Sequence, residues 1–222
     1  MKQLYRIIIL LTIGGAVLTA GILTEERLIT MLPLFASLFI MMYQSEANRF
    51  AYLGGGLNCI LYGVVYLYVG LYASAVSTLL ISMPLQILTF LRWSKRPSGK
   101  STVFRKLSPK QILFVVVCYA VAWVVCYFAL DKSGAGYIAL DNTATLLGIL
   151  VSILTALAYI EYSYLWVASA FLGLGLNIAV MINNPGYVTH VIYAVYSCVC
   201  VLVAARNVHR IYKAQLSSSL AE

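Results

Sequence analysis

The side chains best suited to recognise a small molecule are neutral amides, hydroxyls and aromatic rings that lie inside long apolar stretches. Amides in hydrocarbon need hydrogen-bond partners, and Asn58 and Tyr62, four residues apart, would share one face of a helix. This chemistry suits a flat, polar, uncharged ring compound, because such a ligand stacks on aromatic rings and bonds to amides. We therefore predict a substrate cavity with these lining residues: Asn58, Tyr62, Gln86, Asn142, Thr145, Trp166 and Asn177.

Each of these polar groups also has a purely structural interpretation. An amide inside a membrane helix can bond to a neighbouring helix instead of a ligand. Many of the 17 tyrosines, together with Trp93 and Trp123, fit the aromatic belts that lie at the membrane interface. The sequence leaves both interpretations open.

Three of the seven acidic residues are candidates for structural or gating roles: Glu46, Asp141 and Glu161. An ionisable group at membrane depth is costly and suggests function. Asp141, followed by Asn142 and Thr143, also fits the N-cap of a helix. Glu46 and Glu161 would lie at helix ends, where an anchoring role is the simpler interpretation.

Motifs of enzymes and metal sites are missing from the sequence. Ser98-Gly99-Lys100-Ser101 resembles the end of a P-loop, but Ser94 stands where the first glycine belongs, and no metalloprotease or nucleophile-elbow motif occurs. The five cysteines lie inside apolar runs without metal-ligand spacing, which favours free thiols. We predict no catalytic residue, no metal and no cofactor. The alternative, a membrane-embedded enzyme, would have to use Asp141 or Glu161 as its base.

The composition indicates a membrane protein. Hydrophobic residues make up 62% of the 222 residues and charged residues only 10%, with a mean hydropathy of +0.91, whereas a soluble domain has about 25% charged residues. We predict an all-α integral membrane protein and expect its first span to be retained, because no clear cleavage site is present. Since a spanning helix needs about 20 apolar residues, the chain divides into eight spans: 4–23, 28–44, 50–69, 71–91, 111–130, 138–160, 164–182 and 187–205.

The basic residues predict how these spans are oriented. With eight spans, 13 of the 15 lysines and arginines fall on one side, seven of them in the 92–110 loop. The positive-inside rule places that side, with both termini, in the cytoplasm. Serine, proline and glycine in the 92–110 loop favour a flexible linker. The alternative is a non-transporting scaffold whose basic loop docks a partner or anionic lipid.

The chain contains a weak internal repeat. A shift of 115 residues superposes Ser37 on Ser152 and Glu46 on Glu161, and Gly56-Leu57-Asn58 resembles Gly175-Leu176-Asn177. We predict two parallel three-helix repeats joined by a linker helix, with one additional N-terminal helix. The predicted units are 1–27 for the additional helix, 28–91 and 131–213 for the repeats, 92–130 for the basic loop and linker helix, and 214–222 for a cytoplasmic tail.

Several stretches resemble the PnuC-type vitamin and nucleoside transporters over about residues 30–213. The first repeat shows Gly56-Leu57-Asn58, Gly70-Leu71-Tyr72-Ala73, Gln86 and Trp93. The second repeat shows Leu140-Asp141, Thr145, Ser152, Glu161 and Trp166, followed by Ile192-Tyr193-Ala194-Val195-Tyr196. These resemble the family's run of Asp, Thr, Ser and Glu-x-Trp-x-x-Trp, except that Ser163 stands at the first Trp.

The resemblance implies a SWEET-like arrangement of three, one and three helices in a multi-pass protein of the bacterial inner membrane. It implies facilitated diffusion of nicotinamide riboside or a related nucleoside, with thiamine or riboflavin as alternatives. Trp166 would stack on the ring of the substrate. A cytosolic kinase would trap the product without contacting the transporter, and the resemblance also favours a homo-oligomer. No nucleic-acid partner is expected, because the basic residues lie between apolar spans and do not form a solvated basic face.

Overall fold

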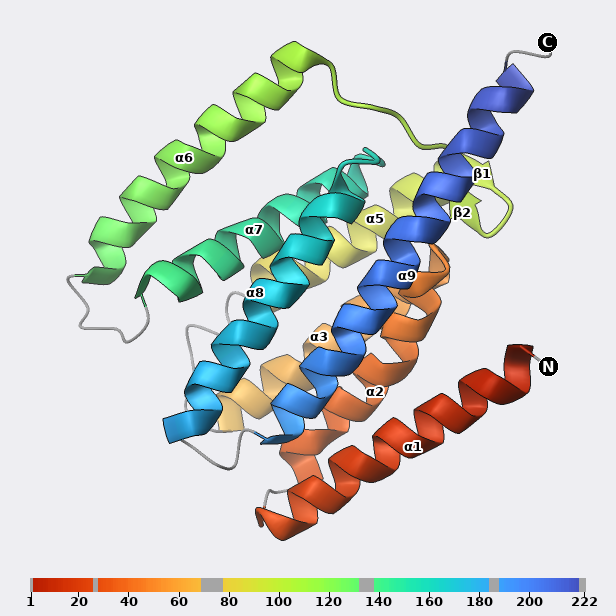
Figure 1. Cartoon of the computed structure of the whole chain (residues 1–222). Coiled ribbons are helices and arrows are strands. Elements are labelled where there is room, and N and C mark those ends of the chain that lie inside the picture. The colour runs from red at the N-terminus through yellow and green to blue at the C-terminus, as the bar shows by residue number, and fades with distance from the viewer. Residues whose placement is uncertain (1, 26–27, 69–77, 132–137, 184–187, 220–222) are drawn as a thin grey trace.

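The computed structural model describes residues 2–25, 28–68, 78–131, 138–183 and 188–219 (Figure 1). These residues form mainly α-helices with one π-helical turn, η1 (Thr78–Ser82), and a hairpin of β1 (Pro97–Ser98) and β2 (Ser101–Thr102). The helices are α1 (Lys2–Leu23), α2 (Leu28–Ser45), α3 (Phe50–Tyr68), α5 (Met83–Lys95), α6 (Pro109–Asp131), α7 (Ile138–Ala156), α8 (Tyr162–Asn183) and α9 (Val188–Ser219).

Six helices form two trios with matching contacts. In the N-terminal trio (α2, α3 and α5) the middle helix α3 packs on both others, and in the C-terminal trio (α7, α8 and α9) the middle helix α8 does the same. The trios meet where α2 packs on α9 and α5 packs on α7. The first helix of each trio thus contacts the last helix of the other, which is the pattern that two parallel repeats produce.

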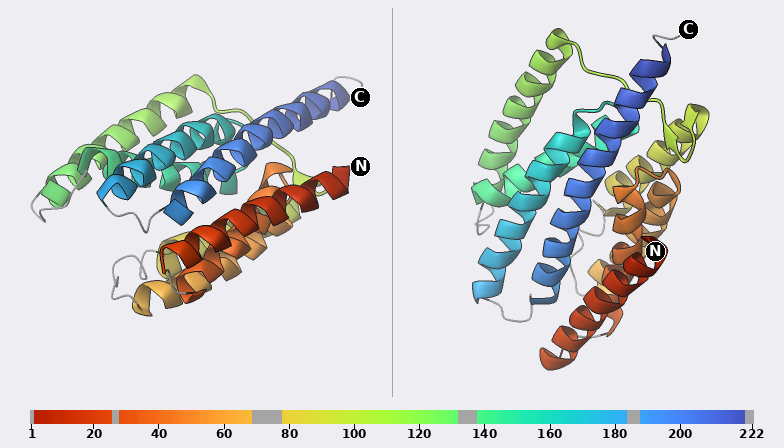
Figure 2. Two further views of the ribbon diagram at one scale, coloured as in Figure 1. Left: turned by 60° about the horizontal axis from the view of Figure 1, so that its bottom comes forward. Right: turned by 45° about the vertical axis from the view of Figure 1, so that its right-hand side comes forward.

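The two remaining helices lie on opposite sides of this bundle (Figures 1 and 2). Helix α1 packs on α2 and α9, while α6 packs on α7. The prediction of an all-α membrane protein with one additional N-terminal helix and a linker helix is therefore confirmed.

Apolar length supports membrane insertion of the described helices. Three segments are long and apolar enough to cross a bilayer, namely Pro109–Phe128, Tyr162–Ala179 and Val188–Ser218. Four apolar helices are shorter, at Ile7–Leu23, Met31–Ser45, Phe50–Val65 and Asn142–Ala156. The start of the fourth predicted span, 71–77, lies outside the described residues. Pro84 lacks a backbone N–H and crowds the preceding turn, which accounts for the π-helical geometry of η1.

Three predicted helix ends are wrong. The span predicted to end at 91 continues to Lys95, so Arg92 and Lys95 of the predicted 92–110 loop lie in α5. The span predicted as 138–160 stops at Ala156, because Ala158 takes a positive φ of 58° and Tyr159 donates its N–H to the Leu154 carbonyl, closing a Schellman motif. Helix α9 continues well past the predicted end at 205 and through the predicted boundary at 213, because Val208 is fully buried beyond the apolar run.

The segment 96–108, here called the strap, is a packed connection rather than the flexible linker that its composition predicts. Its hairpin tip accepts a backbone hydrogen bond at the Lys100 carbonyl from the N–H of Arg49, at 2.9 Å. Further along, the Arg105 N–H donates to the Ala158 carbonyl at 3.0 Å and its carbonyl accepts from Ile160 N–H at 2.9 Å. The strap therefore joins the α2–α3 turn to the α7–α8 turn.

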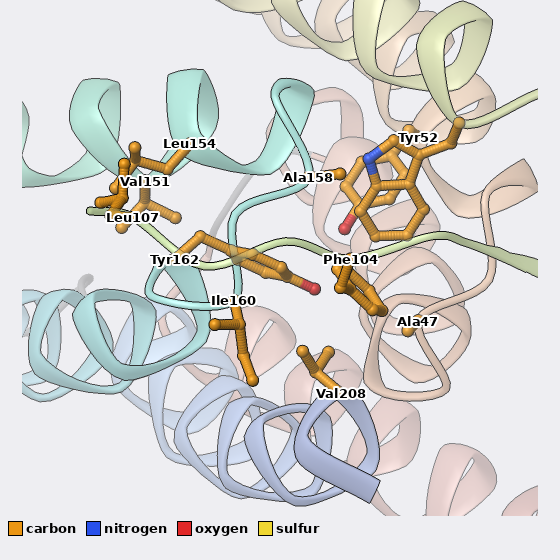
Figure 3. Close-up of a cluster of buried hydrophobic side chains, with 11 residues drawn as sticks. Ala47, Tyr52, Phe104, Leu107, Val151, Leu154, Ala158, Ile160, Tyr162 and Val208 are labelled. Atoms are coloured by element: carbon orange, nitrogen blue, oxygen red, sulfur yellow. The ribbon is translucent and has the colours of Figure 1, made fainter. Parts of the chain in front are cut away.

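An aromatic cluster fills the space under the strap (Figure 3). Trp93 is fully buried and makes edge contacts with Tyr52 and Phe104, at ring-centroid distances of 4.8 and 5.4 Å. Tyr162 lies 6.4 Å from Trp93. These rings come from α3, α5, the strap and α8, so the cluster packs both trios together at one end of the bundle. Trp93 is a core residue, and its interpretation as an interfacial belt residue is wrong.

Gln215 fastens the strap to α9, and its replacement tests how far the strap depends on this helix. Its amide donates to the Thr102 carbonyl at 2.9 Å and accepts from the Phe104 N–H at 3.0 Å. We expect Gln215→Ala to lower stability by about 2 kcal/mol, the sum of two hydrogen bonds. Trypsin cleavage after Arg105 should become faster.

Ser217→Ala is the matched control, because Ser217 lies on the same helix and its hydroxyl donates to the Lys213 carbonyl of that helix at 3.0 Å. Cleavage of Gln215→Ala at the wild-type rate would contradict the role of Gln215 in holding the strap.

Candidate functional site

A cavity of about 340 Å³ lies between the two trios. All six helices of the trios contribute to its wall. Its polar lining residues are Ser37, Gln44, Tyr52, Asn58, Tyr62, Gln86, Thr89, Ser152, Thr155, Tyr193 and Ser197, and Trp166 adds a large ring. None of the described residues in this wall is charged, so the cavity is polar and neutral.

Asn58 is fixed in one orientation by the helix beside it. Its Nδ2 donates to the Ser37 hydroxyl at 2.8 Å and to the Pro33 carbonyl at 3.2 Å. The Ser37 hydroxyl in turn lies 3.4 Å from the hydroxyl of Tyr62. Because both donor contacts use the amide nitrogen, Asn58 Oδ1 is left buried in the cavity wall without a hydrogen-bond partner among the described residues.

Gln86 presents a second acceptor from the neighbouring helix α5. Its Oε1 is buried and also has no partner within the described part of the chain. The side chain lies against α3, where Gly55 leaves room for the amide. A buried acceptor without a partner costs about 1–3 kcal/mol, so the two oxygens together favour an occupant with hydrogen-bond donors.

The cavity is closed at the end that faces the aromatic cluster. Tyr52, Val151 and Trp166 belong both to the cavity wall and to that cluster or its packing shell. Directly beside them, the buried indole Nε1 of Trp93 donates to the Thr155 carbonyl at 2.8 Å. This bond joins α5 of one trio to α7 of the other and seals the cavity toward the strap.

The structure brings together four of the seven residues predicted for the substrate site: Asn58, Tyr62, Gln86 and Trp166. Asn142, Thr145 and Asn177 lie outside the cavity wall. Asn142 donates to the Trp123 carbonyl at 2.9 Å, and Asn177 donates to the Gly173 carbonyl of its own helix, also at 2.9 Å. Thr145 is exposed on α7. The alternative of a bond to a neighbouring helix thus describes Asn142, whereas Asn177 bonds within its own helix.

Two of the three acidic candidates, Glu46 and Glu161, lie away from the cavity wall as well. Glu161 follows the α7–α8 turn and its Oε1 accepts the Leu107 N–H of the strap at 3.1 Å, which is an anchoring contact. Glu46 lies in the α2–α3 turn. Asp141 is not an N-cap residue, because α7 already begins at Ile138, and its side chain is outside the described part of the structure.

Sequence reasoning missed several polar residues of the wall, although the internal repeat contained a signal for some of them. Ser37 and Ser152, which the 115-residue shift superposes, both line the cavity, and the same shift relates Ile40 to Thr155. Ser163 lies outside the wall and donates to the Ile160 carbonyl at 2.8 Å. Ser163, at the position where the family pattern has its first Trp, thus lies in the first turn of α8, and the ring in the wall comes from Trp166.

Comparisons with known proteins agree with this architecture. The family model described as nicotinamide mononucleotide transporter matches residues 27–206. The crystal structure of the vitamin B3 transporter PnuC is similar, with a TM-score of 0.76 and 20% identity, over 95% of this chain and 93% of that chain. No curated protein matches the sequence. Because the family model covers most of the chain, this protein belongs to the PnuC-type nicotinamide mononucleotide transporter family and is a multi-pass membrane transporter rather than an enzyme.

Proposed function

We propose that this protein is a uniporter for a nucleoside-like vitamin precursor, with nicotinamide riboside as the first candidate. It acts in the bacterial inner membrane with both termini in the cytoplasm, and a cytosolic kinase traps the product by phosphorylation. The observation that carries the proposal is a pair of buried acceptors, Asn58 Oδ1 and Gln86 Oε1, that have no partner among the described residues and belong to a cavity wall in which no described residue is charged.

The neutral wall favours a nucleoside over a nucleotide. A phosphate taken out of water needs cations or several strong donors around it, and the described wall residues include no lysine, arginine or histidine. Sugar hydroxyls and a carboxamide N–H are donors that would satisfy Asn58 Oδ1 and Gln86 Oε1. The face of Trp166 suits a flat ring, including the cationic pyridinium of nicotinamide riboside.

A ligand panel tests this proposal directly. We expect titration calorimetry on the detergent-purified protein to detect nicotinamide riboside and to find nicotinamide mononucleotide at least about tenfold weaker, because its phosphate would be buried without a counter-charge. Thiamine, riboflavin and several ribo- and deoxyribonucleosides complete the panel. Equal or tighter binding of the mononucleotide would contradict the nucleoside proposal, and binding of no compound would indicate a substrate outside this panel.

Two asparagines provide a matched test of the cavity. Asn58→Ala should weaken ligand binding about tenfold, since it removes the acceptor and its ordered partners, while Asn177→Ala should leave affinity unchanged because its amide bonds to its own helix. Trp166→Ala should weaken binding by losing the stacking surface. Expression and melting temperature serve as folding controls. Unchanged affinity in both Asn58→Ala and Trp166→Ala would exclude this cavity as the site.

Release of the substrate on the strap side requires the aromatic cluster to separate. The trios are held there by the Trp93 to Thr155 hydrogen bond, and transporters built from repeats alternate access by moving one repeat against the other. On this proposal, breaking the Trp93 bond accompanies opening to the cytoplasm. Trp93 is thus the gate residue of the cytoplasmic end.

Cys59, which lines the cavity, reports on this opening. In a variant with Cys59 as the only cysteine, Trp93→Phe keeps most of the ring but removes the donor. We expect an impermeant thiol reagent, applied from the cytoplasmic side, to label Cys59 about fivefold faster, because one net hydrogen bond of about 1 kcal/mol no longer favours the closed state.

Trp123→Phe is the control for the loss of an indole donor. Trp123 Nε1 donates to Thr143 Oγ1 at 2.9 Å between α6 and α7, and so does not join the trios. Equal labelling rates in wild type and Trp93→Phe would exclude Trp93 as the gate.

A further inference from the structure

Three consecutive glycines on α3 meet different neighbours on the adjoining helices. A Cβ atom at Gly54 would lie 3.4 Å from Ile40 Cγ1, and one at Gly56 would lie 3.1 Å from Ile87 Cγ1. A Cβ atom at Gly55 would instead meet the amide of Gln86, at 3.0 Å from Oε1, 3.1 Å from Cδ and 3.4 Å from Nε2. Only Gly55 thus faces the polar head of a neighbouring side chain.

The amide and the glycine share the same part of the cavity. Gly55 and Gln86 both line its wall, and Gly55 is buried. The atom that a side chain at position 55 would strike first is Gln86 Oε1, the buried acceptor without a partner among the described residues. Gln86 Oε1 can therefore take this position in the wall because Gly55 has no side chain.

We propose that Gly55 is a positioning residue for substrate recognition, because it lets the Gln86 amide lie directly on the backbone of α3 with Oε1 buried in the cavity wall. This inference rests on the proposed function. Any side chain at position 55 must move the amide by a few tenths of an ångström or rotate it, and binding sites require their polar groups within about 0.5 Å of the productive geometry. Inside a helix, alanine is more favourable than glycine wherever the added methyl group has room. A loss of affinity on replacing Gly55 by alanine would therefore come from the contact with the Gln86 amide and not from helix propensity.

A double-mutant cycle separates positioning from direct contact. We expect Gly55→Ala to raise the Kd for nicotinamide riboside about fivefold, the loss typical of one hydrogen bond. In a Gln86→Ala background the same change should have no further effect, because the amide that it displaces is gone. Gly54→Ala is the matched control on the same helix, since its Cβ makes an ordinary contact, and it should leave Kd unchanged.

The outcomes distinguish this inference from the proposed function. Equal losses from Gly55→Ala in both backgrounds would overturn the positioning role, because alanine would then act on the ligand or the cavity itself. Unchanged affinity in Gly55→Ala would overturn it as well. If the wild-type protein binds no nucleoside, the proposed function fails, and the same cycle on ligand-free melting temperature decides whether Gly55 sets the amide. Non-additive effects of Gly55→Ala and Gln86→Ala on the melting temperature would support the contact between these two residues, and additive effects would exclude it.

Discussion

The C-terminal end of α7 is the point on which the closed arrangement of the two trios depends. The last carbonyls of a helix have no partners within it. Here the carbonyl of Thr155, in the last turn of α7, and those of Leu157 and Ala158, just beyond the helix, accept donors from other segments of the chain. The Thr155 carbonyl accepts a hydrogen bond from the indole N–H of Trp93. The Leu157 carbonyl accepts one from the Nε–H of Arg105, and the Ala158 carbonyl accepts one from the backbone N–H of Arg105. The guanidinium also suits the negative end of the helix dipole. One helix terminus thus holds both the opposite trio and the strap.

The same closure explains why the cavity can be polar. Burying amides without partners is unfavourable, and the protein limits this cost by fixing Asn58 Nδ2 between two acceptors, so that among the described residues only Oδ1 of this amide is left without a partner. Gln86 adds a second buried oxygen, Oε1, from α5. Both oxygens belong to the wall of the cavity, which the aromatic cluster separates from the strap. The cavity is therefore prepared for a donor-rich occupant and not for bulk apolar packing.

Apolar length predicted the helices, because each span must satisfy its backbone within the membrane. It did not predict where α7 ends, since Ala158 turns by a left-handed conformation that its sequence does not mark. The strap was missed because its partner Gln215 lies more than one hundred residues away. Asn58 and Asn177 both follow a Gly-Leu pair, so the local sequence does not distinguish them. Only the folded structure shows that Asn58 lines the cavity, whereas Asn177 bonds to its own helix.

The pseudo-symmetric scaffold holds an asymmetric cavity. Ser37 and Ser152 occupy matching positions of the two trios and both line the wall, but the orphan acceptors of Asn58 and Gln86 come from the N-terminal trio alone. The large ring of Trp166 comes from the C-terminal trio. A nucleoside bound as proposed would place its donors on one trio and its flat ring on the other. Since a ligand shifts a conformational equilibrium only by its differential contacts, a substrate that bridges both trios favours the closed state and must lose one set of contacts before it leaves.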